Sequence, residues 1–244
     1  MAPAAPLLPM PGYSIKRDTI AIRGVATLRI QSLLDRDQYA DPLGEAQALG
    51  ISSAQWPLFG LAWPSGLQLA AQVGDRAVVA GERILEVGCG LALASLVAHR
   101  RGADVTASDC HPLTGRFLRR NLRLNGLPPL KYRQGLWADR ATAWTPPSTL
   151  SPPAPESVVR GRFDLIMGSD VLYERDDGGA LAGFVGHHAQ PRAEVWIVDP
   201  DRGNRPAFSR RMADQGFALD EQRLDRPAHD GAAAYKGRLL RYLR

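Results

Sequence analysis

Residues 83–92, RILEVGCGLA, decide the fold that we predict for this chain of 244 residues. The segment begins with a short apolar run typical of a buried β-strand, and Gly88 and Gly90 follow it in a turn. Residues 92–101 have the apolar spacing of a helix, and Gly102 stands where helices commonly end. The segment therefore predicts a strand, a glycine turn and a helix in direct succession.

The same alternation of strand and helix continues along the chain. Near-continuous apolar runs are typical of strands that are buried on both faces of a parallel sheet. Segments with apolar residues at helical spacing separate or follow these runs, which indicates parallel βαβ units. We predict further strands at residues 104–108, 131–136, 163–168 and 194–198, and helices at residues 113–125, 179–188 and 205–215. The fold class is therefore α/β, with a Rossmann-like, mostly parallel and doubly wound sheet.

The two ends of the chain extend this core. Residues 19–30 alternate apolar and polar residues around Arg23 and Gly24, which predicts an N-terminal β-hairpin. Near the C-terminus, residues 218–224 and 238–243 alternate as an antiparallel strand pair would. Ser65 precedes an apolar helical run, and we expect its side-chain oxygen to cap that helix.

The predicted domain organisation follows from these elements. Residues 1–55 form an N-terminal extension made of a proline-rich segment and the hairpin. Residues 56–244 form one main domain. Within it, residues 145–157 have five prolines and no periodicity, so we interpret them as a loop insertion.

Composition excludes several classes of protein. Hydrophobic residues make up 45% of the chain and charged residues 23%, which argues against disorder and coiled coil. No apolar run reaches the ~18 residues of a bilayer-spanning helix, so we expect no membrane association. Residues 1–11 combine several prolines with no Lys or Arg, unlike a secretory signal, and we expect a cytoplasmic location. The cysteines Cys89 and Cys110 form no CxxC pair, which argues against zinc and disulfide frameworks.

The formal net charge of +5 raises the question of a nucleic-acid partner. The cations are mostly arginines scattered in ones and twos, and no run of five like charges marks a binding tail. A general bias of composition towards arginine explains this charge better than a dedicated nucleic-acid surface does.

The glycine pair at the strand-to-helix corner predicts a site for a nucleotide-type ligand. A helix N-terminus directs free N–H groups at a ligand, and glycine lets the backbone approach it closely. Asp109 lies 19 residues after Gly90, at the end of the next predicted strand. A carboxylate there can accept hydrogen bonds from both ribose hydroxyls. The alternative is a tight turn with an unrelated Asp109.

The residue after the turn separates two classes of cofactor. A dinucleotide fingerprint needs Gly or Ala three positions after Gly90, and Leu93 stands there, which argues against a nicotinamide or flavin cofactor. The small residue is Ala92 instead. The spacing Glu86-x-Gly88-x-Gly90-x-Ala92 resembles the S-adenosylmethionine loop of seven-strand methyltransferases.

A second group of polar residues follows the strand predicted at residues 163–168. Ser169, Asp170 and Tyr173 come directly after it, where reactive groups of open α/β sheets lie. We expect Asp170 and Tyr173 to face the reacting group. The alternative is a helix-capping Asp170 and a packed Tyr173.

These motifs together resemble the seven-strand S-adenosylmethionine-dependent protein-lysine methyltransferases, whose fourth strand is followed by Asp-x-x-Tyr. The branch most like this chain is the electron-transfer-flavoprotein β-subunit lysine methyltransferase with its bacterial relatives, because residues 62–66 (AWPSG) and 198–200 (VDP) match its segments. Residues 202–208 continue the second match. Ala92 in place of the third glycine, Asp201 within the family's Asp-Pro-Gly-Arg, and the proline-rich insertion depart from the pattern.

The resemblance implies a role for each site residue and a seven-strand sheet. Trp63 lies by the methionine part of S-adenosylmethionine and Trp137 by its adenine. The predicted cofactor-binding set is Trp63, Glu86, Gly88, Gly90, Asp109, Trp137 and Ser169. Asp170 accepts an N–H of the attacking lysine amine, and Tyr173 supplies an aromatic wall or a hydroxyl. We predict no metal site, because His111 has no second ligand at metal-type spacing and adjacent His187 and His188 do not share a helix face.

The predicted function is transfer of a methyl group from S-adenosylmethionine to a lysine of a protein partner. Two alternatives stay open on the same sequence. The first is an RNA or small-molecule N-methyltransferase, although the chain has no Asn/Asp-Pro-Pro-Tyr/Phe signature. The second is a non-catalytic binding protein that retains the fold.

Overall fold

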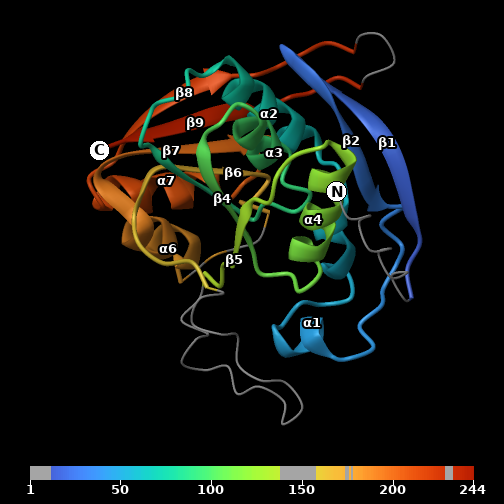
Figure 1. The fold of residues 1–244 in the computed structure, drawn as a ribbon. Coiled ribbons are helices and arrows are strands. Elements are labelled where there is room, and N and C mark those ends of the chain that lie inside the picture. The colour runs from blue at the N-terminus through green and yellow to red at the C-terminus, as the bar shows by residue number, and fades with distance from the viewer. Residues whose placement is uncertain (1–11, 138–157, 174–175, 177, 229–232) are drawn as a thin grey trace.

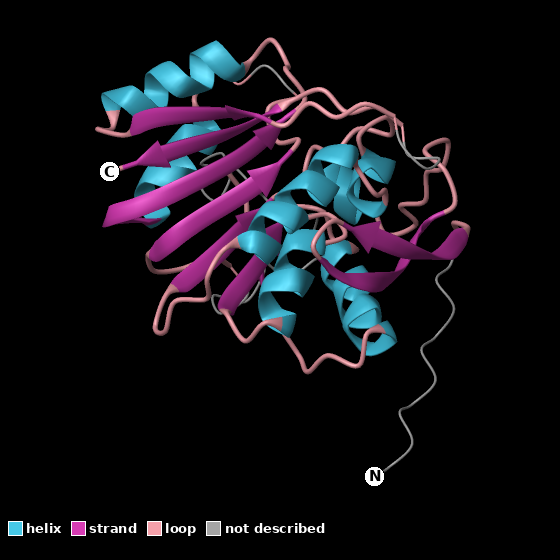
Figure 2. Ribbon diagram, turned by 90° about the horizontal axis from the view of Figure 1, so that it is seen from above, coloured by secondary structure: helices cyan, strands magenta, loops and turns pink. Residues whose placement is uncertain are grey.

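The computed structural model describes residues 12–137, 158–173, 176, 178–228 and 233–244. Residues 1–11 and the predicted insertion at residues 145–157 lie outside the described residues. A seven-stranded sheet forms the centre of the molecule, with helices on both of its faces (Figures 1 and 2). A separate two-stranded hairpin precedes it in the sequence.

The sheet is mostly parallel and ends in an antiparallel pair. Its strands are β3 (Arg83–Val87), β4 (Asp104–Asp109), β5 (Lys131–Gln134), β6 (Phe163–Ser169), β7 (Ala189–Asp199), β8 (Ala218–Arg223) and β9 (Arg238–Leu243). Their order is β5-β4-β3-β6-β7-β9-β8, and only β9 pairs antiparallel with its neighbours, β7 and β8. The strand order switches at β3, because the chain continues to β4 and β5 on one side of β3 and then returns to β6 on the other side. Open α/β sheets bind ligands at such a switch point.

Helices cover the two faces of the sheet. They are α2 (Pro64–Asp75), α3 (Leu93–Arg100), α4 (Thr114–Leu124), α6 (Ala180–His188) and α7 (Arg205–Asp214). Alternate residues of each strand point to opposite faces. Ile84 therefore packs in one apolar core with α2, α3 and α4, whereas Leu85 packs in a second core with α6 and α7. The near-continuous apolar strands predicted from the sequence are explained by these two cores.

The N-terminal hairpin consists of β1 (Ile15–Ile22) and β2 (Val25–Leu33) and lies beside α4 (Figure 1). The free edge of β2 is bound by asparagine side chains. Asn121 Oδ1 accepts the N–H of Gln31 at 2.8 Å, and Asn125 Oδ1 accepts the N–H of Arg29 at 2.9 Å. The hairpin also buries its apolar side chains in the core of α2–α4. The division that we predicted between residues 55 and 56 stays a prediction.

The segment between the hairpin and α2 contains two short elements, α1 (Glu45–Ala48) and the 3-10 helix η1 (Trp56–Gly60). The capping role predicted for Ser65 is wrong. Helix α2 begins at Pro64, whose fixed φ suits the first helical position, so Ser65 lies inside the helix. Its Oγ lies 3.0 Å from the hydroxyl of Tyr235 instead. None of the helices in the described residues combines the length and the hydropathy that a membrane-spanning helix needs.

Candidate active site

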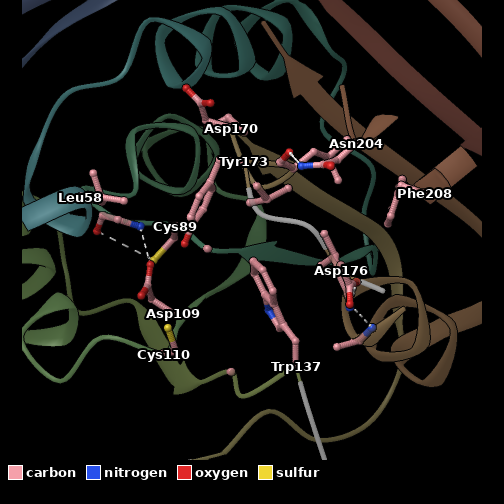
Figure 3. A pocket seen from close by; sticks show the side chains of 18 of the residues that line it. Leu58, Cys89, Asp109, Cys110, Trp137, Asp170, Tyr173, Asp176, Asn204 and Phe208 are labelled. Atoms are coloured by element: carbon pink, nitrogen blue, oxygen red, sulfur yellow. Dashed lines mark hydrogen bonds between the residues drawn. The ribbon is translucent and has the colours of Figure 1, made fainter. Parts of the chain in front are cut away.

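A pocket of about 1400 Å³ opens at the carboxyl ends of the parallel strands (Figure 3). Pockets for small ligands are usually ~300–1,000 Å³, so this one has room for a nucleotide-sized ligand and a second group. Every residue that the sequence predicted for the site lines it: Trp63, Glu86, Gly88, Gly90, Asp109, Trp137, Ser169, Asp170 and Tyr173.

The turn between β3 and α3 needs its two glycines. Gly88 and Gly90 have φ of 57° and 50°, in the left-handed region that disfavours side chains. A Cβ on Gly88 would lie 2.8 Å from Val171 Cγ1, and one on Gly90 would lie 3.0 Å from the carbonyl oxygen of Phe59. The glycines thus allow close packing of the protein around the turn, in addition to the approach of a ligand.

Ala92 takes the place of the third glycine and keeps the conformation that a glycine would have. Its φ is 57°, and it precedes the first residue of α3 without giving that helix a side-chain cap. A left-handed residue with a Cβ costs roughly 1–2 kcal/mol. Ala92 is therefore a strained position inside the loop.

Glu86 replaces the missing cap from the neighbouring strand. Its buried carboxylate accepts hydrogen bonds from the Ser95 N–H, at 2.8 Å, and from the Ser95 hydroxyl. Ser95 lies in the first turn of α3, where N–H groups have no partner within the helix. Burial raises the pKa of Glu86 to about 7, although the hydrogen bonds from Ser95 act to lower it. Glu86 therefore fixes α3 behind the glycine turn.

Asp109 joins the end of β4 to the same turn. Its Oδ2 accepts the N–H of Gly90 at 2.9 Å, and its Oδ1 accepts the N–H of His111 at 2.8 Å. Burial raises the pKa of Asp109, and these backbone donors act to lower it. Each carboxylate oxygen has a second lone pair, so Asp109 can still accept hydrogen bonds from a diol in the pocket.

His111 lines the pocket and is almost fully buried, at 3% exposed. Its ring stacks on Phe59 with the centroids 3.8 Å apart. Burial lowers the pKa of His111 to about 3, so the ring is neutral. Its Nδ1 accepts the N–H of Leu113, and among the described residues no group of three metal-binding side chains occurs. His111 is thus a wall of the pocket.

Two tryptophans line the pocket. Trp63 precedes α2, and its indole N–H donates to the carbonyl of Leu58 at 2.8 Å. Trp137 lies where a Cβ on Gly88 would approach its ring to 3.3 Å. The buried indole nitrogen of Trp137 has no hydrogen-bond partner among the described residues. In Figure 3, Asp170 lies at one edge of the pocket and Trp137 at the opposite edge, with Tyr173 between them.

Asp170 follows β6 and is held by an arginine that sequence reasoning missed. The Nε and Nη2 of Arg202 lie 2.8 and 2.5 Å from Asp170 Oδ1. Asp170 has φ of 59°, and its N–H donates to the carbonyl of Val198 at 2.9 Å. The alternative interpretation that Asp170 caps a helix is wrong, because its carboxylate binds Arg202. That role belongs to Asp176, whose carboxylate accepts the N–H groups of Ala180 and Leu181 at the start of α6.

Tyr173 and the turn after β7 complete this side of the pocket. The Tyr173 side chain is 43% exposed and lines the pocket, so it is not the packed core residue of the alternative interpretation. Asn204 donates from Nδ2 to the carbonyl of Leu172 at 2.9 Å. The sequence signal for Arg202 and Asn204 was the similarity of residues 202–208 to the family, which named no partner for either side chain.

Comparison with solved structures shows what fold this is. The 16S rRNA N2 G1207 methyltransferase of T. Thermophilus, solved with AdoMet and guanosine, aligns with a TM-score of 0.57 and 19% sequence identity. The alignment covers 98% of this chain and 52% of that protein. The chain shares the Rossmann-like fold of that protein. The Rossmann-like class, the seven strands and the antiparallel C-terminal pair predicted from the sequence are confirmed.

Curated proteins similar in sequence to this chain confirm the resemblance that the motifs indicated. The electron transfer flavoprotein beta subunit lysine methyltransferase of Mus musculus is 28% identical over 70% of this chain. EEF1A lysine methyltransferase 3 of Mus musculus is 26% identical over 65%, and a histone-arginine methyltransferase of Rattus norvegicus is 30% identical over 55%. The chain spans 60%, 63% and 56% of the lengths of these relatives. No protein-family model matches the chain.

Proposed function

We propose that this chain binds S-adenosylmethionine and transfers its methyl group to a lysine side chain of a protein. The observation that carries the proposal is the meeting of two groups in one pocket. The glycine turn with Asp109 lies after β3 and β4, and Asp170 with Tyr173 lies after β6. The relatives that act on lysine support the class of substrate.

The residues of the pocket fit this cofactor. Asp109 presents a buried carboxylate braced by two backbone N–H groups, which suits a ribose diol. The unpartnered indole N–H of Trp137 gives the adenine side a hydrogen-bond donor. Trp63 also lines the pocket, and we assign it to the methionine part. When bound, S-adenosylmethionine supplies a methyl group that is already electrophilic.

The protein then has to position a nucleophile and exclude water. A lysine amine has an ordinary pKa of about 10.4, so it must lose a proton before its lone pair can attack. The Asp170 carboxylate would accept an N–H of that amine and aim the lone pair, while the Tyr173 ring would form a wall beside it. Alignment of the reacting atoms at ~3–3.5 Å lowers the barrier, because the entropy of bringing them together is lost on binding.

A second candidate acceptor is an arginine side chain. The relative named as a histone-arginine methyltransferase favours it, with 30% identity over 55% of this chain. A guanidinium group also carries N–H groups, and Asp170 could accept hydrogen bonds from them. The two acceptors differ in the methylated amino acid that forms.

The cytoplasmic location stays a prediction of the sequence.

The test is transfer of label from methyl-labelled S-adenosylmethionine to a cell lysate by the purified chain, with and without nuclease. We expect label in a protein that survives nuclease and yields methyl-lysine after acid hydrolysis. Methyl-arginine would support the second candidate, and label lost to ribonuclease would support an RNA substrate. Binding of the cofactor with no transfer to protein, RNA or small molecules would leave a non-catalytic binding protein.

A further inference from the structure

We propose that Arg202 and Asn204 are positioning residues that hold Asp170 and the backbone after it in place for the methyl acceptor. Both belong to the segment of residues 199–204, which we call the β7–α7 turn. The inference rests on the proposed function and adds to it the element that prepares the acceptor side of the pocket.

Two side chains of the β7–α7 turn form hydrogen bonds with the segment from Asp170 to Tyr173. The Arg202 guanidinium binds Asp170 through Nε and Nη2, at 2.8 and 2.5 Å. The Asn204 amide donates to the Leu172 carbonyl at 2.9 Å. These contacts join positions 32 residues apart in the sequence. The segment after β6 is therefore held at its first residue and again two residues further on.

These hydrogen bonds are important because the backbone at Asp170 is strained. A φ of 59° is disfavoured for a residue with a Cβ, and such conformations persist only when the surroundings hold them. The N–H of Asp170 donates to the carbonyl of Val198, directly before the β7–α7 turn. Without Arg202, the Asp170 side chain would lose its two charged hydrogen bonds and its fixed direction.

The β7–α7 turn is itself anchored from behind. Asp199 Oδ2 accepts the N–H of Arg202 at 2.7 Å. Asp201 accepts hydrogen bonds from Arg223 and Arg238, each at 2.6 Å, which ties the turn to β8 and β9. Asp201 also has φ of 60°, so it adopts the conformation of the glycine that it replaces. The departure from the family pattern at this position thus adds an anchor.

The geometry leaves one oxygen of Asp170 for the acceptor. Both hydrogen bonds from Arg202 go to Oδ1, and among the described residues no side chain donates to Oδ2. The side chain of Asp170 is 11% exposed and that of Arg202 is 37% exposed. Because solvent reaches the Arg202 guanidinium and screens part of the attraction, we assign the pair a role in orienting Asp170.

The experiment compares four variants with the wild-type chain. Arg202→Ala should lower kcat about 10- to 100-fold and change the dissociation constant of S-adenosylmethionine less than about twofold, because positioning contributes to the chemical step and the glycine turn lies elsewhere. Arg202→Lys should recover part of the loss, since lysine retains the charge but not the fork. Asn204→Ala should lower kcat several-fold. Arg205→Ala is the matched control, because Arg205 pairs with Glu221 and does not line the pocket.

A double-mutant cycle separates positioning from general damage. In the background Asp170→Asn, where the carboxylate is already gone, Arg202→Ala should cost less than about twofold further in kcat. Hydrogen exchange of peptides covering residues 170–173 should speed up in Arg202→Ala and stay unchanged in Arg205→Ala. Equal losses of kcat in both backgrounds, or unchanged exchange, would overturn the inference. A wild-type chain that transfers no methyl group would contradict the proposed function, and the exchange rates would still decide whether Arg202 holds Asp170.

Discussion

The two sides of the pocket are built differently. On the cofactor side, Glu86 and Asp109 are buried and bind backbone N–H groups of residues close to them in space, within one βαβ unit. On the acceptor side, Asp170 is bound by a side chain, and its partner Arg202 comes from another turn 32 residues later.

This difference fits a division of labour. Backbone donors are present whatever the side chains are, so a site built on them stays the same while the sequence drifts. A site built on pairs of side chains changes when either partner changes. We therefore expect the cofactor side to be a fixed part of the fold and the acceptor side to be the part that is adapted to a particular substrate.

The largest expected effect concerns Asp170, on the acceptor side of the pocket. Asp170→Asn should lower kcat at least ~100-fold, because a neutral amide binds and orients an amine less well than a carboxylate. The affinity for S-adenosylmethionine should not change, since Asp170 lies outside the glycine turn. Single-turnover methyl transfer, with the exposed Asp220→Asn as a control, measures this. Equal turnover in the two variants would remove Asp170 from the chemistry.

The next effect concerns the turn itself. Gly88→Ala should destabilise the fold by about 3 kcal/mol, combining a left-handed backbone with a Cβ that lies 2.8 Å from Val171. The matched control is Gly102→Ala, where φ is also positive but a Cβ would meet nothing within 4 Å. Its cost should be only about 1–2 kcal/mol, from the backbone alone. Denaturant unfolding measures both. Equal losses would mean that packing at Gly88 is looser than described.

A pH effect follows from Glu86, whose pKa is raised by burial from 4.5 to about 7. The folded chain therefore binds a proton that the unfolded chain releases between these two values. The contribution of Glu86 to stability should fall as pH rises from 4.5 to about 7, by roughly 3 kcal/mol, and stay level above that.

Glu86→Gln should remove this slope, because glutamine does not titrate and its oxygen can still accept from Ser95. The measurement is the free energy of unfolding of both chains at several pH values. The difference between the chains should vary with pH over this range. A constant difference would show that Glu86 is ionised in the folded protein throughout.

The smallest effect concerns Ala92. Ala92→Gly should stabilise the fold by about 1 kcal/mol, since glycine adopts a φ of 57° without strain. Ala94→Gly, two residues on and inside α3, should instead destabilise it by about 1 kcal/mol. Thermal unfolding of the two variants gives the opposite signs that we expect. A loss of stability in Ala92→Gly would mean that its methyl group contributes packing that outweighs the strain.

The difference between the two sides also explains what the sequence could predict. The cofactor side depends on local signals, namely two glycines, a small residue and an acid after the next strand, and each lies where it was predicted. Asp170 and Tyr173 formed a local motif too. The ion pair with Arg202 had no local signal, because pairing between distant segments depends on how the whole sheet is assembled.

Other features followed from packing that composition does not reveal. Ser65 was predicted as a helix cap. Because α2 begins at Pro64, Ser65 lies inside the helix, and its hydroxyl contacts the hydroxyl of Tyr235. The burial of His111 against Phe59 depends on η1, a short element that no periodicity marks. The mostly parallel sheet, by contrast, followed from strands that alternate with helices along the chain.

Calorimetric titration of S-adenosylmethionine tests most directly whether the pocket has a cofactor side and a separate acceptor side. It compares the wild-type chain with Asp109→Asn and Asp170→Asn. We expect binding by the wild-type chain, the same affinity in Asp170→Asn, and an affinity at least ~10-fold lower in Asp109→Asn. Absence of binding by a folded wild-type chain, or equal weakening in both variants, would contradict the division of the pocket into a cofactor side and an acceptor side.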